Sequence, residues 1–233
     1  MAYYFEVGVE ILPPSKNLVW PLRRWTEDLS GLCEKCHVQI LGIHSPWVWS
    51  LGDFIKNFHK FQPKDNLIGL ASVLVFGLGK TGRTASIAQT LRVYYVVHPE
   101  AINLDATWVR YSKNILVENN WPESQYGKGI PAASAVSKTL GVGTVLDTSH
   151  CARLKEDILL AYQIMKPTVI HFSDSPLGEH GHLPWGEGEM PLRELLEMAA
   201  ADPGFNQSGV IIVELRSPRG LEMTIQKVKN IIG

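Results

Sequence analysis

The sequence predicts an α/β protein built as a parallel (β/α) TIM barrel. Short β-branched and apolar runs recur along its 233 residues, and amphipathic stretches separate them. Runs that are apolar on both faces are typical of a parallel sheet covered by helices, and repeated strand–helix alternation indicates βαβ units. Each of the seven runs ends in His, Asp or Glu, and the strand ends of a barrel share one mouth. A doubly wound sheet would spread these side chains along an edge, which would explain less well why so many of them are possible ligands.

The expected strands are, in order, Phe5–Glu10, Val38–His44, Val93–His98, Asn114–Glu118, Gly143–Asp147, Thr168–His171 and Val210–Glu214. Apolar residues at helical spacing predict helices between them, at Trp20–Cys36, Lys64–Leu91, Pro131–Leu140, Leu154–Met165, Pro191–Ala201 and Leu221–Ile232. A closed barrel of this kind has eight strands. Either Ala71–Phe76 is the eighth, or the barrel is a short variant with seven. The variant is favoured, because Leu67–Leu78 also has the pattern of a buried helix.

Composition narrows the classes of protein further. Hydrophobic residues make up 45% and charged residues 19%, and the absence of linkers and repeats predicts one domain over residues 1–233. A formal net charge of −1 excludes a globally basic nucleic-acid binder. No apolar run reaches the roughly 18 residues of a membrane span. Three cysteines and an N-terminus unlike a signal peptide predict a cytoplasmic protein. The oligomeric state is left open.

Histidines gather where the predicted strands end. Six of the eight lie at or soon after these ends, namely His44, His98, His150, His171, His180 and His182. Imidazoles and carboxylates are natural ligands of Zn²⁺ and Mn²⁺, and Glu118, Asp147 and Glu214 end neighbouring strands. Any one of these histidines alone is better explained as structural. As a set they predict a divalent-metal site.

Seven short segments carry a family resemblance in chain order. They are IHSPW (43–47), VVHPE (96–100), LVEN (116–119), LDTSH (146–150), HFSDS (171–175), HLPWGEG (182–188) and IIVEL (211–215). Each is weak alone, but the ordered series resembles the xylose isomerase-like barrel superfamily. That superfamily holds sugar and sugar-phosphate isomerases and epimerases, together with endonuclease IV-type apurinic (AP) endonucleases of AP endonuclease family 2.

The resemblance implies a set of metal ligands. One core ion would be held by Glu118, Asp147, His171 and Glu214. In endonuclease IV-type members two further ions sit beside it. The second would use His44 and His98 with Glu118 as a bridge, and the third would use His150, His182 and an Asp two residues before the latter. Here that Asp position is His180, which could ligate but changes the charge of the site. One ion is expected, and two or three are the alternative.

Two reactions follow from the resemblance. In an isomerase or epimerase, the ion would chelate neighbouring sugar oxygens and stabilise an enediolate, while Glu118 and Glu214 remove and return the proton. In an endonuclease acting on abasic DNA, the ions would serve phosphodiester hydrolysis, and Trp47 could wedge into a DNA groove. A third possibility is a barrel that binds metal or sugar without turnover. The sugar reaction is favoured, because few Lys or Arg lie on the mouth loops to hold a phosphate backbone.

The candidate substrate-binding residues lie on loops near the expected mouth. They are Trp47, Trp121, Trp185 and Glu187. Aromatic walls are typical of small-molecule sites, although tryptophans can also cover the hydrophobic ends of a barrel. Asp174 and Glu187 could orient His171 or His182 by accepting a ring N–H, or could cap loop turns, and this choice stays open.

Two rival motifs have structural explanations. The pattern G-x-G-x-x-G at residues 77–82 would suggest a dinucleotide site, but the next strand ends in His98, inside the metal series. The pattern C-x-x-C-H at residues 33–37 matches haem attachment, which belongs to exported proteins.

Overall fold

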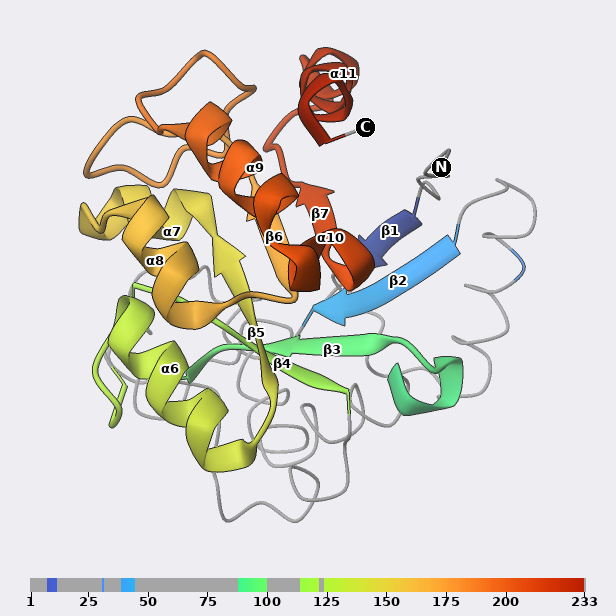
Figure 1. Cartoon of the computed structure of the whole chain (residues 1–233), viewed down its shortest axis with the longest axis vertical. Coiled ribbons are helices and arrows are strands. Elements are labelled where there is room, and N and C mark those ends of the chain that lie inside the picture. Colours follow the sequence, from blue (N-terminus) through green and yellow to red (C-terminus); the bar gives the residue numbers. More distant parts are fainter. Residues whose placement is uncertain are drawn as a thin grey trace, which may run out of the picture. The chain divides into compact units, whose positions relative to one another are not determined.

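A computed structural model of the chain describes residues 8–11, 31, 39–44, 88–99, 114–121 and 124–232 (Figure 1). Contacts divide the chain into two compact units. The first, called the N-terminal unit, comprises residues 6–97 and 101–115. The second, called the C-terminal unit, comprises residues 1–5, 98–100 and 116–233. The single domain over residues 1–233 stays a prediction.

The N-terminal unit contains three parallel strands, β1 (Gly8–Ile11), β2 (Gln39–His44) and β3 (Tyr94–Val97). The strand β2 pairs with β1 and with β3, and an irregularity in β1 lies between Val9 and Glu10. Ile43 and the last three residues of β3 are buried, as expected for strands whose side chains pack on both faces.

The C-terminal unit contains the strands β4 (Ile115–Glu118), β5 (Gly143–Asp147), β6 (Val169–Phe172) and β7 (Val210–Val213). They are parallel, and each pairs with the next along the chain. Every residue of β4 and β6 is buried. All seven predicted strands are therefore confirmed, with ends within one residue wherever the structure describes both. The rule that each strand ends in a ligand needs a small correction, since Glu10 and His171 are penultimate residues and His98 and Glu214 follow the last residue.

Helices follow the strands of the C-terminal unit. They are α6 (Gly129–Leu140), α7 (Thr148–Leu154), α8 (Ile158–Met165), α9 (Leu192–Ala201), α10 (Pro203–Ser208) and α11 (Leu221–Ile232) (Figure 1). The expected helix Leu154–Met165 was wrong as a single element. It begins only at Ile158, because Lys155 adopts a left-handed φ of 57° and Asp157 caps a new helix by accepting from the N–H groups of Leu159 and Leu160.

Two other parts of the helix prediction have different outcomes. The short helix α10 was missed, although Asp202 followed by Pro203 is a typical helix start, and Asp202 accepts from the N–H of Gly204. The expected helices at residues 20–36 and 64–91 fall mostly outside the described residues. Of these two ranges, the structure describes Gly31 and residues 88–91, and these are helical. Ala71–Phe76 also lies outside, so an eighth strand there stays an open question.

The helices pack by apolar faces at helical spacing. In α9 the buried residues are Leu192, Leu195, Leu196 and Ala199, and α9 contacts α8, α10 and α11. Each such leucine contributes about 1.5–3 kcal/mol by burial, which fixes the helices around β5–β7. In the described part of the chain, no helix combines the length and apolar character needed to cross a bilayer.

Candidate metal centre

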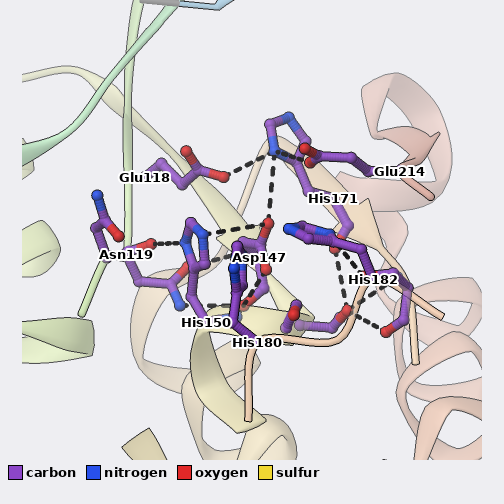
Figure 2. Close-up of polar contacts among 12 residues, drawn as sticks. Glu118, Asn119, Asp147, His150, His171, His180, His182 and Glu214 are labelled. Atoms are coloured by element: carbon purple, nitrogen blue, oxygen red, sulfur yellow. Dashed lines mark hydrogen bonds and ion pairs between the residues drawn. The ribbon is translucent and has the colours of Figure 1, made fainter. Parts of the chain in front are cut away.

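The ends of β4, β5 and β6 and the residue after β7 bring four predicted ligands together. We call Glu118, Asp147, His171 and Glu214 the carboxylate cluster (Figure 2). His171 Nδ1 lies 2.7 Å from Glu118 Oε1, 3.3 Å from Glu214 Oε2 and 4.0 Å from Asp147 Oδ2. Glu118, Asp147 and His171 are at most 1% exposed, whereas the side chain of Glu214 is 43% exposed. One open side and a buried floor suit a site that small molecules enter.

The acids of this cluster crowd one another. Burial, together with the charge of Glu118, raises the pKa of Asp147 to about 6. Burial also raises the pKa of Glu214. Three carboxylates around one ring nitrogen repel each other in a medium of low dielectric, and a dication between them would relieve that repulsion. The donor set of three carboxylates and one imidazole fits Zn²⁺ or Mn²⁺. Ligand atoms of Glu118, Asp147 and His171 lie within 4.8 Å of one another, and Glu214 forms a second such group with Asp147 and His182.

Asp147 is held from both sides. Its Oδ1 caps α7 by accepting from the N–H of His150 at 2.8 Å, which leaves Oδ2 toward His171. Asn119, directly after Glu118, donates from Nδ2 to the carbonyl of Asp147 (3.1 Å) and accepts its N–H (2.7 Å). This buried amide fastens the end of β4 to the end of β5. We did not predict it, although its position beside a ligand in the segment LVEN is the signal that could have found it.

His98 approaches the other side of Glu118. Its Nε2 lies 2.6 Å from Glu118 Oε2, and both side chains are buried. Each oxygen of Glu118 therefore meets a histidine, His171 on one side and His98 on the other, which is the placement a bridging carboxylate requires. His44 ends β2 in the N-terminal unit, and its part in a second ion site stays a prediction.

Three further histidines form a second group, which we call the imidazole cluster: His150, His180 and His182 (Figure 2). The ring centroid of His180 lies 4.2 Å from that of His182 and 5.1 Å from that of His150. The Trp121 ring lies 4.3 Å from His180, so this predicted substrate residue is beside the cluster. The ligand atoms of the three histidines lie within 4.8 Å of one another.

Burial favours the neutral form of His150 and of His180. It lowers the pKa of His150 to about 4 and, with the neighbouring His182 and His150, that of His180 to about 3. His150 Nδ1 lies 2.6 Å from the carbonyl of Asn119. A carbonyl only accepts, so Nδ1 carries the proton and His150 Nε2 keeps a lone pair for a ligand.

The loop between β6 and α9 carries His180 and His182. Asp174 and Leu183 exchange two backbone hydrogen bonds of 2.8 Å, so the loop folds back on itself. The Asp174 carboxylate accepts from the N–H groups of Ser175, Gly186 and Met190. Two roles were predicted for Asp174, to orient a histidine ring or to cap loop turns. These hydrogen bonds, all from backbone N–H groups of the loop, are those of turn capping. His182 adopts a φ of +48°, an uncommon conformation for a non-glycine residue that functional sites often contain.

The remaining predicted substrate residues have different surroundings. Trp185 packs edge-on against Phe172 at 5.5 Å, and Lys227 Nζ of α11 donates to its carbonyl at 2.7 Å. Glu187 is exposed, and Trp47 lies outside the described residues. A role of these three in substrate binding stays a prediction.

Arg216 is a site residue that the sequence reasoning missed. It follows the ligand Glu214 by two positions, and this position is the signal that could have found it. Its guanidinium donates to the carbonyl of His180, and its backbone N–H donates to the carbonyl of His182 at 3.1 Å. Both regions with rival motifs, residues 77–82 and 33–37, lie outside the described part of the chain.

Comparison with family models and with curated proteins gave no match. Solved structures do match over nearly the whole chain. A D-tagatose 3-epimerase-like protein has a TM-score of 0.64 at 18% identity, covering 96% of this chain and 88% of its own. A xylose isomerase domain protein from Planctomyces limnophilus has a TM-score of 0.62 at 12% identity, covering 97% and 87%. A protein from Thermus thermophilus, soaked with ZnCl₂, has a TM-score of 0.55 at 13% identity, covering 97% and 98%.

At these identities the likeness is one of fold. It agrees with the chain order of the strands and with their parallel pairing. The resemblance inferred from the seven short segments is therefore confirmed at the level of architecture. The chain has the fold of the xylose isomerase-like TIM barrels.

Proposed function

We propose that this protein is a divalent-metal-dependent isomerase or epimerase of a sugar or sugar phosphate. The observation that supports this most is the position of two glutamates about one ring nitrogen. Glu118 and Glu214 approach His171 Nδ1 at 2.7 and 3.3 Å, and Asp147 lies beside them. Two carboxylates about one small site suit a reaction that takes a proton from carbon and returns it.

The four members of the carboxylate cluster would hold one ion, Zn²⁺ or Mn²⁺. When bound, the ion would polarise the oxygens of a substrate as a Lewis acid. The match to a structure soaked with ZnCl₂ supports testing zinc first. Further ions at His44 and His98, or at the imidazole cluster, stay predictions.

The two glutamates would divide the proton transfer between them. Glu214 is more exposed than Glu118, but it is still partly buried, and this burial raises its pKa. A raised pKa brings a carboxylate closer to the strength of a base that works near neutral pH. Glu118 is buried between His171 and His98, so its orientation is fixed. We assign Glu214 as the group that meets substrate first and Glu118 as its partner. Trp121, beside the imidazoles, would form part of the wall.

A second candidate is an endonuclease IV-like phosphodiesterase of abasic DNA. It is favoured by the imidazoles that a one-ion site does not need, above all His98 at 2.6 Å from Glu118 and His150 next to Asp147. Against it stands the near-zero net charge of the chain, since DNA backbones are held by Lys and Arg. A small-molecule partner in the cytoplasm is the proposal that we carry forward.

Proton exchange in D₂O tests the sugar reaction without knowledge of the product. The zinc- or manganese-loaded protein is incubated with pairs of ketoses and their phosphates, and deuterium uptake at carbon is followed by NMR. We expect deuterium in at least one sugar, and none with Glu214→Gln. The matched control is Glu222→Gln, an exposed residue of α11.

The same preparations are given a duplex with one abasic site. Cleavage of this DNA, with no exchange in any sugar, would replace the isomerase by the phosphodiesterase. Neither activity in a protein that retains its ion would favour a barrel that binds without turnover.

A further inference from the structure

The imidazole cluster differs in its donors from an ordinary three-histidine metal site. His150 is arranged as a ligand, because its Nδ1 donates to the carbonyl of Asn119 and its Nε2 keeps a lone pair. His182 Nδ1 lies 3.2 Å from the hydroxyl of Ser173, which can donate or accept. The third ring, His180, has a neighbour that can only donate hydrogen bonds.

That neighbour is Arg216. Its Nη2 lies 3.5 Å from His180 Nδ1 and also donates to the carbonyl of His180. A guanidinium only donates hydrogen bonds, so Nδ1 of His180 must be the acceptor. The ring proton is then on Nε2. A histidine whose Nε2 carries hydrogen offers a donor at that atom, not the lone pair that a metal ion requires.

His180 Nε2 is buried, and among the described residues it has no hydrogen-bond partner. The rings of His182, His150 and Trp121 pack against the His180 ring, with centroids 4.2, 5.1 and 4.3 Å from its own. A buried N–H that stays unpaired costs about 1–3 kcal/mol, so a group that accepts from it would be favoured there.

The charges around His180 point to the kind of acceptor. Asp147 faces the other two rings, with its Oδ2 3.8 Å from His150 Nε2 and a ligand atom within 4.8 Å of one on His182. Beside His180 itself lies Arg216, a permanent cation. Where the resemblance places an aspartate that would hold a third cation, this chain has a hydrogen-bond donor and a guanidinium.

We propose that His180 and Arg216 form a binding subsite for an anionic group of the substrate, a phosphate or a carboxylate, in place of a third metal ion. The anion accepts from His180 Nε2–H and from the guanidinium of Arg216. The inference rests on the proposed function and makes it narrower, because it selects a sugar phosphate or sugar acid over a neutral sugar.

Calorimetric titration with inorganic phosphate tests the subsite, with the metal content of every sample measured beside it. His180→Leu removes the donor, Arg216→Gln removes the cation, and His180→Gln keeps an N–H near the place of Nε2. Loss of one charge-assisted hydrogen bond should weaken phosphate binding about 10- to 100-fold in the first two. We expect His180→Gln to stay within about threefold of the unchanged protein. Arg219→Gln, an exposed neighbour, is the matched control.

Substrate-like probes separate the two anions. D-Ribulose 5-phosphate against D-ribulose reports a phosphate, and D-glucuronate against D-glucose reports a carboxylate. We expect one charged member to bind at least tenfold more tightly than its neutral partner, and Arg216→Gln to abolish that preference. Because Arg216 is exposed, this variant tests the subsite even where His180→Leu fails to fold.

Three results would overturn the subsite. They are the loss of a bound ion on His180→Leu, which would make His180 a ligand, unchanged phosphate binding in Arg216→Gln, and equal binding of charged and neutral sugars. Failure of the proposed function has a different signature. A chain that binds phosphate through Arg216 but takes up no metal would retain the subsite and reject the metal centre.

Discussion

The carboxylate cluster and the imidazole cluster are neighbours, but we propose that they bind opposite charges. The first stands on the ends of β4–β7 and gathers three acids around His171, so it gains from a cation. The second stands on α7 and on the loop after β6, and combines three imidazole rings with Arg216. Histidine occurs in both. What each ring can bind is decided by the group at its other nitrogen, a carbonyl for His150 and a guanidinium for His180.

The largest expected effect concerns the acids of the carboxylate cluster. Glu118→Gln and Glu214→Gln keep the size of the side chains but remove the proton acceptors, so the rate of proton exchange with sugar should fall about 10²–10⁴-fold. The kcat in D₂O is the measurement, with Glu194→Gln on the exposed face of α9 as control. A fall below tenfold in both variants would remove them from the reaction.

Asn119→Ala should lower the stability of the fold without removing phosphate binding at the imidazole cluster. Asn119→Ala removes the amide that pairs with both the N–H and the carbonyl of Asp147, and unpaired buried backbone groups cost about 1–3 kcal/mol each. We expect about 3 kcal/mol less unfolding free energy in urea. The exposed Asn206→Ala of α10 should change it by less than about 0.5 kcal/mol. His150 bonds to the Asn119 backbone, so phosphate binding should survive at temperatures where the variant is folded; its loss would count against separate clusters.

Gly188 probes the loop of the imidazole cluster. A Cβ there would lie 2.4 Å from Asp174 Oδ1 and 2.4 Å from the backbone nitrogen of Ser175. Gly188→Ala should therefore cost about 1–3 kcal/mol and weaken phosphate binding, while metal content stays unchanged. Gly204→Ala on α10 is the control, because the nearest atom there is 3.3 Å away and belongs to a side chain. Loss of metal in Gly188→Ala would show that the clusters do not act separately.

The smallest expected effect is the pH dependence of metal binding, which can be measured without a mutation. The pKa of Asp147 is raised from 3.8 to about 6 in the folded, metal-free protein, so folding favours its protonated form. The stability that this proton contributes is full below pH 3.8 and is lost as the pH rises through 6. An ion competes for the same carboxylate, so its affinity should rise about tenfold per pH unit up to about pH 6 and then level off.

The imidazole cluster would give a different profile. The pKa values of His150 and His180 are lowered to about 4 and 3, so these rings are already neutral at about pH 5. Zinc titrations between about pH 5 and 7.5 distinguish the two. A metal affinity that does not change between about pH 5 and 6 would contradict an ion held by Asp147.

The strands were predictable because a buried parallel strand leaves a compact apolar run that a charged residue ends. The same ends marked the four members of the carboxylate cluster among seven residues, and the family resemblance singled these four out as one ligand set. The individual hydrogen bonds between residues far apart in the chain could not be predicted. The contacts of Asn119 with Asp147, and of Arg216 with His180, join residues 28 and 36 positions apart, and no periodicity encodes them. The break at Lys155 was hidden for a different reason, since the apolar pattern continues across it.

Metal content in two variants tests whether the carboxylate cluster holds the ion. Elemental analysis of protein soaked in zinc and then desalted is compared for the unchanged chain, Asp147→Asn and His180→Gln. We predict about one ion per chain, lost with Asp147→Asn and retained with His180→Gln. No metal in any preparation would contradict the metal centre, and loss of the ion with His180→Gln alone would place it among the imidazoles instead of the acids.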